Sequence, residues 1–233
     1  QSRAIEELLV RQGIPYRVVG GTRFYERAEI KDALAYLQVI SNPDDTVALR
    51  RIINTPRRGI GAKAEADLIA HSDRYGISMG AAARDCWISQ GRGLGEAEGT
   101  GLTLAELPKE EAEETRGGVA GLSPRAASAI GDFWGLIEAM RRAEQAGASA
   151  AEILEEVLDR TGYLATLRRS QDPQDASRVE NLAELHAVAL DYVQTSGEVG
   201  LAGFLERVAL VADSDQLPEE ESGSGQVTLM TVH

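Results

Sequence analysis

The chain has 233 residues, of which 43% are hydrophobic and 26% charged, a length and composition typical of one folded domain that can carry fragments of a neighbouring one. Its formal net charge of −13 argues against a uniformly basic surface, and its single Cys excludes an internal disulfide and a cysteine-based zinc site. No apolar run approaches the ~20 residues of a membrane span, and the first residues do not resemble a signal peptide, so we expect a cytoplasmic protein without membrane contact.

The first part of the chain alternates helices with tight turns. Apolar spacing predicts a helix over 2–12 and a short strand over 14–19, which ends at a Gly pair. A strong amphipathic helix follows over 26–41, with core-facing positions at Ile30, Leu34, Leu37 and Ile40. After an Asn-Pro-Asp-Asp turn, three further helices are predicted, over 46–53, 62–75 and 78–90.

The second part begins with a stretch of different composition. Residues 91–122 contain eight Gly and seven Glu, which favours a flexible acidic insert with a brief helical piece at 104–115. Ser123 and Pro124 are typical of a helix start, and helices are predicted over 124–146, 149–161, 174–195 and 198–212. An acidic linker over 213–225 precedes 226–233, which alternates like a strand.

The predicted fold class is therefore mainly α, with a short strand near each end. This order is expected when a helical domain is inserted into an α/β neighbour and both cut strands are retained.

Charge is divided unevenly along the chain. The first 74 residues carry twelve Lys and Arg against ten Asp and Glu, so an anion-binding face is expected in this part.

No catalytic constellation is visible. The chain lacks the phosphate-binding motif G-x-x-x-x-G-K-[ST], the nucleophile motif G-x-S-x-G and the zinc motif H-E-x-x-H. Pairs of adjacent Glu fall on helix surfaces, where solvent is the ordinary neighbour. We therefore expect no catalytic residue, cofactor or metal in this chain.

The most informative segment is NTPRRGIGAK, residues 54–63. Two Gly flanking an apolar residue allow the backbone to approach a ligand, and the amides that start the next helix can then accept a phosphate. This layout is typical of a helix–hairpin–helix contact to a nucleic-acid backbone; the alternative is a plain tight turn between two helices. The candidate contact residues are Thr55, Arg57, Arg58, Gly59, Ile60, Gly61 and Lys63.

A second candidate is GGTRFYER, residues 20–27. Gly21, Thr22 and Arg23 precede a helix start and are candidates for a phosphate contact. The alternative is a hinge that caps the helix over 26–41, with Phe24 or Tyr25 held in the core.

Several sequence segments, taken together, resemble the UvrD/PcrA/Rep group of superfamily 1 DNA helicases. They are QSRAIEELL, IPYRVVGGTRFYERAEIKDALAYLQVISNPDD, RIINTPRRGIG, EILEEVLDRTGYLATL, SRVENLAEL and VTLMTVH. The resemblance implies that 19–223 form the helical 2B subdomain inserted in the second motor domain, and that 1–18 and 224–233 belong to that motor domain, called 2A. It also implies that 2B grips duplex DNA through the GIG element and swivels between open and closed orientations. Thr231 and His233 would begin a motor motif that contacts single-stranded DNA.

The resemblance further implies the chemistry of a longer protein. Such a protein would be an ATP-dependent DNA helicase of repair or replication that uses ATP and Mg²⁺, and it would act on duplex DNA and on junctions between single and double strands. This chain alone would hydrolyse no ATP. The runner-up hypothesis is that the chain is a protein-interaction and autoinhibition module that binds other repair proteins.

The single Cys carries a separate hypothesis. Cys86 follows Met79, Ala82 and Ala83 at helical spacing, which indicates a half-buried helix residue. The alternative is a surface thiol that joins two copies into a homodimer through an intermolecular disulfide.

Overall fold

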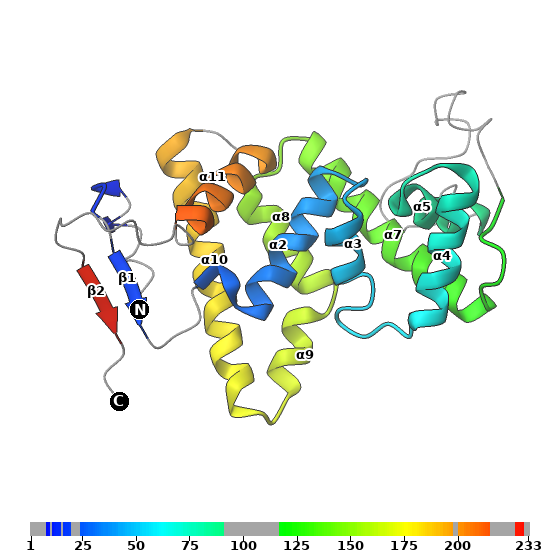
Figure 1. Cartoon of the computed structure of the whole chain (residues 1–233), viewed down its shortest axis with the longest axis horizontal. Coiled ribbons are helices and arrows are strands. Elements are labelled where there is room, and N and C mark those ends of the chain that lie inside the picture. The colour runs from blue at the N-terminus through cyan, green and yellow to red at the C-terminus, as the bar shows by residue number, and fades with distance from the viewer. Residues whose placement is uncertain are drawn as a thin grey trace.

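A computed structural model describes residues 8–9, 11–14, 16–19, 24–90, 117–197, 200–214 and 227–230. Within these residues the chain is mainly helical, as predicted. Figure 1 shows an elongated row of helices, with two strands at one end and α4 and α5 at the other. The first half contains β1 (Tyr16–Val19), a 3₁₀ turn (Phe24–Glu26), α2 (Ala28–Ser41), α3 (Thr46–Ile52), α4 (Ala62–Tyr75) and α5 (Met79–Ser89). The second half contains α7 (Pro124–Gln145), α8 (Ala150–Arg160), α9 (Tyr163–Arg169), α10 (Pro173–Ser196), α11 (Leu201–Ser214) and β2 (Val227–Met230).

The two strands come from opposite ends of the chain. β1 pairs with β2 in parallel, with Tyr16 opposite Val227 and Val19 opposite Met230. Parallel strands require a crossover connection, because their ends point the same way. Here the whole helical body forms that connection (Figure 1).

The centre of the core is α2, which contacts α3, α7, α8, α10 and α11. All four positions predicted to face inward are buried: Ile30, Leu34, Leu37 and Ile40. Phe133 and Trp134 of α7 are fully buried as well, and Phe133 lies 6.4 Å from the ring of Tyr36 on α2. Burial on this scale, at about 1.5–3 kcal/mol for each large apolar side chain, holds the helices together.

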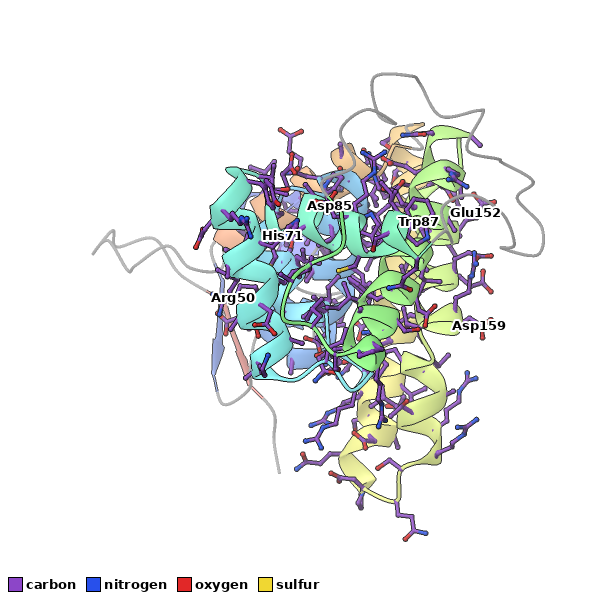
Figure 2. All side chains as sticks on the ribbon, turned by 90° about the vertical axis from the view of Figure 1, so that its right-hand side faces the viewer. Arg50, His71, Asp85, Trp87, Glu152 and Asp159 are labelled. Atoms are coloured by element: carbon purple, nitrogen blue, oxygen red, sulfur yellow. The ribbon has the colours of Figure 1, made fainter. Side chains whose placement is uncertain are left out.

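Side-chain caps fix where several helices begin. Asp45, Ser78 and Ser123 each accept a hydrogen bond from the backbone three residues on, at α3, α5 and α7. At α8 the capping box is complete, because Ser149 accepts from the Glu152 amide and Glu152 accepts from the Ser149 amide. The bonds from the Ser149 amide and hydroxyl lower the pKa of Glu152, which is labelled in Figure 2.

The end formed by α4, α5 and α7 contains two tight contacts. His71 Nε2 of α4 lies 2.9 Å from Asp85 Oδ2 of α5, and both side chains are buried (Figure 2). Gly80, in the first turn of α5, lies directly against the turn after α2, since a Cβ there would stand 2.0 Å from the Pro43 carbonyl oxygen. These contacts fix α4 and α5 relative to α2 and α3.

Two predictions about helices need correction. The sequence did not predict α9, a seven-residue helix that begins after Gly162, whose φ is +72°. Two turns of helix are too short to produce a clear apolar repeat. The helix predicted over 26–41 begins at Ala28, because Phe24–Glu26 form a 3₁₀ turn. The linker was predicted over 213–225, but α11 extends to Ser214. The rest of the linker, the predicted helical piece at 104–115 and most of the acidic insert lie outside the described residues.

Candidate nucleic-acid interface

The loop between α3 and α4 is open to solvent at its tip. Arg57, Gly59, Gly61 and Lys63 are all exposed, whereas Ile60 between the two Gly is only 3% exposed. The Ile60 side chain is therefore an apolar anchor, as the sequence predicted, and the exposed surface of the turn belongs to its neighbours. In Figure 1 this loop runs along the lower edge of the molecule, between α3 and α4.

The two Gly of the loop have different backbone requirements. Gly59 has φ of +81°, a conformation that side chains rarely adopt, so this position requires Gly. Gly61 has φ of −91° and ψ of 173°, which any residue can adopt, and a Cβ there would meet nothing within 4 Å. The backbone conformation therefore explains why position 59 is Gly, but it does not explain why position 61 is Gly.

Backbone amides at the start of α4 have no acceptor within the described part of the chain. The N-cap, Gly61, has no side chain to accept from them. Asn54 Oδ1 accepts from the Arg58 amide at 2.8 Å and from the Ile60 amide at 3.3 Å, so these two are satisfied. Of the remaining amides, we refer to those of the exposed residues Gly59, Gly61, Ala62 and Lys63 as the amide cluster. Exposed amides at a helix N-terminus favour an anion.

Arg58 points inward rather than toward solvent. Its Nη1 donates to the Ile52 carbonyl at 3.0 Å and to the Thr55 carbonyl at 3.1 Å, and its Nη2 donates to the Tyr36 hydroxyl. Its guanidinium also lies 5.0 Å from the ring centre of Phe133. Arg58 was predicted to contact phosphate, but in the structure it holds the loop against α2 and α7.

Tyr36 completes this support from α2. Its hydroxyl donates to the Thr55 carbonyl at 2.6 Å. Burial raises the pKa of Tyr36 to about 12, although the nearby Arg58 charge lowers it. The hydroxyl therefore remains a donor at neutral pH. Since the Thr55 carbonyl accepts from both Tyr36 and Arg58, it is turned toward the protein.

The remaining basic residues of this element differ in their partners. Arg57 is exposed, and no acceptor for its guanidinium lies among the described residues. Lys63 Nζ donates to Asp67 Oδ2 at 2.7 Å and to the Gly121 carbonyl at 3.1 Å, with 79% of its side chain exposed. Glu65, in the first turn of α4, is paired with Arg50 at 2.6 Å. The two acids in the first half of α4, Glu65 and Asp67, thus each form an ion pair with a base.

Several predicted contact residues cannot be placed. Gly21, Thr22 and Arg23 lie outside the described residues, as do Thr231 and His233. The aromatic pair that follows Arg23 is buried, with Phe24 2% and Tyr25 7% exposed. Both rings therefore pack in the core. The interpretation of this segment as a hinge predicts such packing for one of the two.

Cys86 is buried in α5, with 1% of its surface exposed. Burial raises the pKa of its thiol to about 11. A protonated thiol inside the core cannot reach a second copy of the chain. The alternative of an intermolecular disulfide is therefore not supported, and the residue is more deeply buried than predicted.

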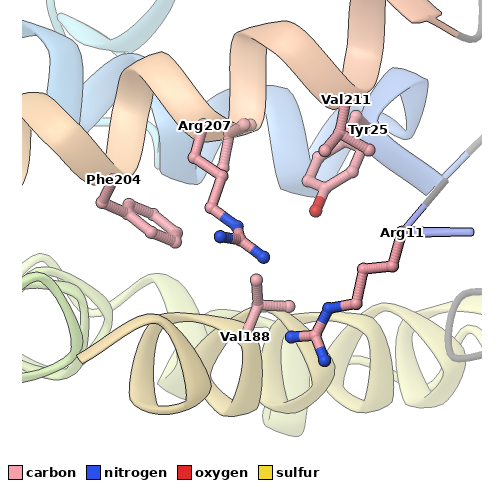
Figure 3. Close-up of a pocket in the computed structure, with 7 residues that line it drawn as sticks. Arg11, Tyr25, Val188, Phe204, Arg207 and Val211 are labelled. Atoms are coloured by element: carbon pink, nitrogen blue, oxygen red, sulfur yellow. The ribbon is translucent and has the colours of Figure 1, made fainter. Parts of the chain in front are cut away.

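A small hollow between α10 and α11 lies apart from the α3–α4 loop (Figure 3). Its lining is mostly apolar, and one of its two Arg, Arg11, is paired with Asp191 at 3.2 Å. The described residues contain no group of His, Cys, Asp or Glu suited to a metal ion, and none of their helices is long and apolar enough to cross a membrane. The α3–α4 loop is thus the strongest candidate site of the described structure.

Comparisons with known proteins show which family the chain belongs to. Residues 1–96 match the family model of the UvrD-like helicase C-terminal domain. The whole chain is 41% identical to the ATP-dependent DNA helicase UvrD1 of Mycobacterium tuberculosis (strain ATCC 25618 / H37Rv) and covers 28% of it. It is 35% identical over its whole length to the ATP-dependent DNA helicase PcrA of Bacillus subtilis (strain 168), again covering 28%. The chain thus spans a little over a quarter of the length of these relatives, and it belongs to the UvrD/PcrA type of superfamily 1 helicase.

Proposed function

We propose that this chain is the duplex-contacting, regulatory part of an ATP-dependent DNA helicase. The amide cluster and Arg57 would hold a phosphate of the double helix. The observation that carries this proposal is the exposed start of α4, where uncapped amides lie beside two Gly and an Arg without a partner. Contacts of this kind hold the DNA backbone and read no base sequence. The expected ligand is therefore any duplex, or the duplex side of a junction with a single strand.

The proposal extends to the organisation of the chain. Residues 19–223 would form the inserted 2B subdomain, and 1–18 with 224–233 would belong to motor domain 2A. The parallel pairing of β1 with β2, across the whole helical body, supports this division. ATP hydrolysis with Mg²⁺ would belong to the motor domains of the whole protein, as the names of the relatives suggest.

The sharpest test of the proposed contact is Gly61→Thr. Position 61 accepts a side chain without strain, and Thr is as good an N-cap as Gly, so stability should change by less than about 0.5 kcal/mol. The new side chain would block the approach of a phosphate, and its hydroxyl would occupy an amide of the cluster. We expect affinity for a fluorescent blunt duplex at 50 mM salt, measured by anisotropy, to fall about tenfold, as for one lost charge-assisted hydrogen bond.

Gly200→Thr is the matched control. Gly200 directly precedes α11, its carbonyl accepts from the Phe204 amide, and a Cβ there would also meet nothing within 4 Å. This variant should bind the duplex like the parent chain. Equal affinity of all three folded proteins would show that the start of α4 does not contact DNA.

The runner-up function, a protein-interaction and autoinhibition module, is favoured by the acidic charge of the residues after position 74. Arg57 separates the two functions better than Arg58, because Arg58 supports the fold. Neutralising Arg57 should weaken duplex binding if the chain binds DNA through this loop. It should leave duplex binding unchanged if the main function of the chain is to bind other proteins.

A further inference from the structure

We propose that Arg125, at the start of α7, is a further DNA-contacting residue that acts together with the α3–α4 loop. This inference rests on the proposed function. It adds a contact from a helix that begins about 60 residues later in the chain. Arg125 was not among the predicted contact residues, because nothing in the sequence places it near Gly59.

The geometry brings Arg125 to the loop. A Cβ built on Gly59 would lie 4.0 Å from Arg125 Nε and 4.0 Å from its Nη2. The side of Gly59 that lacks a side chain therefore faces the guanidinium. A phosphate oxygen seated on the amide cluster at this point would lie within reach of the guanidinium donors. An Arg can offer two parallel donors to a phosphate, which a single amide cannot.

The guanidinium of Arg125 is free to take a ligand. It is exposed, and no acceptor for it lies in the part of the chain that the structure describes. Its neighbours around the loop differ in this respect: Arg50 is paired with Glu65, and Lys63 with Asp67. Arg57 and Arg125 are therefore cations of this region that form no ion pair with the described residues and are open to an anion.

Arg125 is also poorly placed for the stability of its own helix. It lies in the first turn of α7, which contains no acidic residue, and a positive charge is unfavourable at a helix N-terminus. Ser123 already caps this end, since its hydroxyl oxygen accepts from the Ala126 amide. A role in α7 thus does not explain the residue, whereas a contact to an anion beside Gly59 does.

The test is a salt titration of duplex binding by the full chain carrying Arg125→Gln, with the same blunt duplex as above. Loss of one phosphate contact lowers the slope of log K against log salt concentration by about 0.9. We expect this change together with an affinity about five- to tenfold weaker at 50 mM salt. Arg125→Lys, which retains the charge, should keep the slope of the parent chain.

Arg142→Gln is the matched control. It removes the same charge from the last turn of α7, about 25 Å away along the helix, which is more than twice the Debye length at 0.1 M salt. An equal effect of Arg125→Gln and Arg142→Gln, or no effect of Arg125→Gln, would overturn the inference. If Gly61→Thr still weakens binding in that case, the proposed function stands and only the role of Arg125 fails. If neither Gly61→Thr nor Arg125→Gln changes binding, both fail.

Discussion

Replacing Arg58 with Met should lower the free energy of unfolding by about 2–4 kcal/mol. The substitution would remove a half-buried guanidinium that donates to the carbonyls of Ile52 and Thr55 and to the Tyr36 hydroxyl. These acceptors would lose a charged donor, and such hydrogen bonds contribute more than neutral ones. The loop that presents the amide cluster would lose its support, so duplex affinity should fall even where the variant is folded.

Urea unfolding followed by circular dichroism measures this effect, and Arg57→Met is the control. Arg57 precedes Arg58 in the same loop but is exposed and makes no hydrogen bond to the described residues, so its stability should change by less than about 0.5 kcal/mol. Arg58→Lys should recover only part of the loss, because an ammonium cannot reproduce the planar fork. Equal stability of the two Met variants would contradict the inward role of Arg58.

Gly80→Ala should destabilise the chain by at least about 2 kcal/mol, as expected for overpacking against backbone. The added Cβ would stand 2.0 Å from the Pro43 carbonyl oxygen and 3.0 Å from Trp134. Neither neighbour can move easily, since one is backbone and the other a fully buried ring. The expected result is a clear fall in the thermal midpoint, with α5 displaced from the turn after α2.

Gly131→Ala provides the comparison for this effect. Gly131 lies inside α7, and the three atoms nearest to a Cβ there, from 2.8 to 3.0 Å, all belong to the carboxamide of Gln90, the far end of a flexible side chain. Ala also favours the helix by about 1 kcal/mol over Gly, which offsets part of the contact. Gly131→Ala should therefore be much milder. A Gly80→Ala chain as stable as the parent would show that α5 does not lie so close to the turn.

The sequence predicted several helix starts and the form of the α3–α4 turn because these depend on local chemistry. Ser123 before Pro124 is a start signal that acts within one turn, and the structure has the cap there. Ile60 between two Gly predicted a buried anchor under an exposed turn, and both features are present. Local patterns of this kind need no knowledge of the remaining fold.

What the sequence did not predict depends on contacts between distant segments. Arg58 and Arg57 are adjacent and chemically equal, and only the position of Tyr36 and Phe133 decides that Arg58 turns inward. Asn54 accepts hydrogen bonds from the Arg58 and Ile60 amides, and this role was not predicted. The general tendency of Asn to accept from nearby backbone amides in turns could have indicated it. Arg125 carried no signal at all, because its place beside Gly59 follows from the packing of α7.

The central claim is that the α3–α4 loop holds phosphates of a double helix, and the salt dependence of duplex binding by the unmodified chain tests it most directly. Two to four phosphate contacts predict an affinity that falls roughly ten- to a hundredfold between 50 and 200 mM salt. Duplex affinity that does not change over this range, or no detectable binding at 50 mM, would contradict the account.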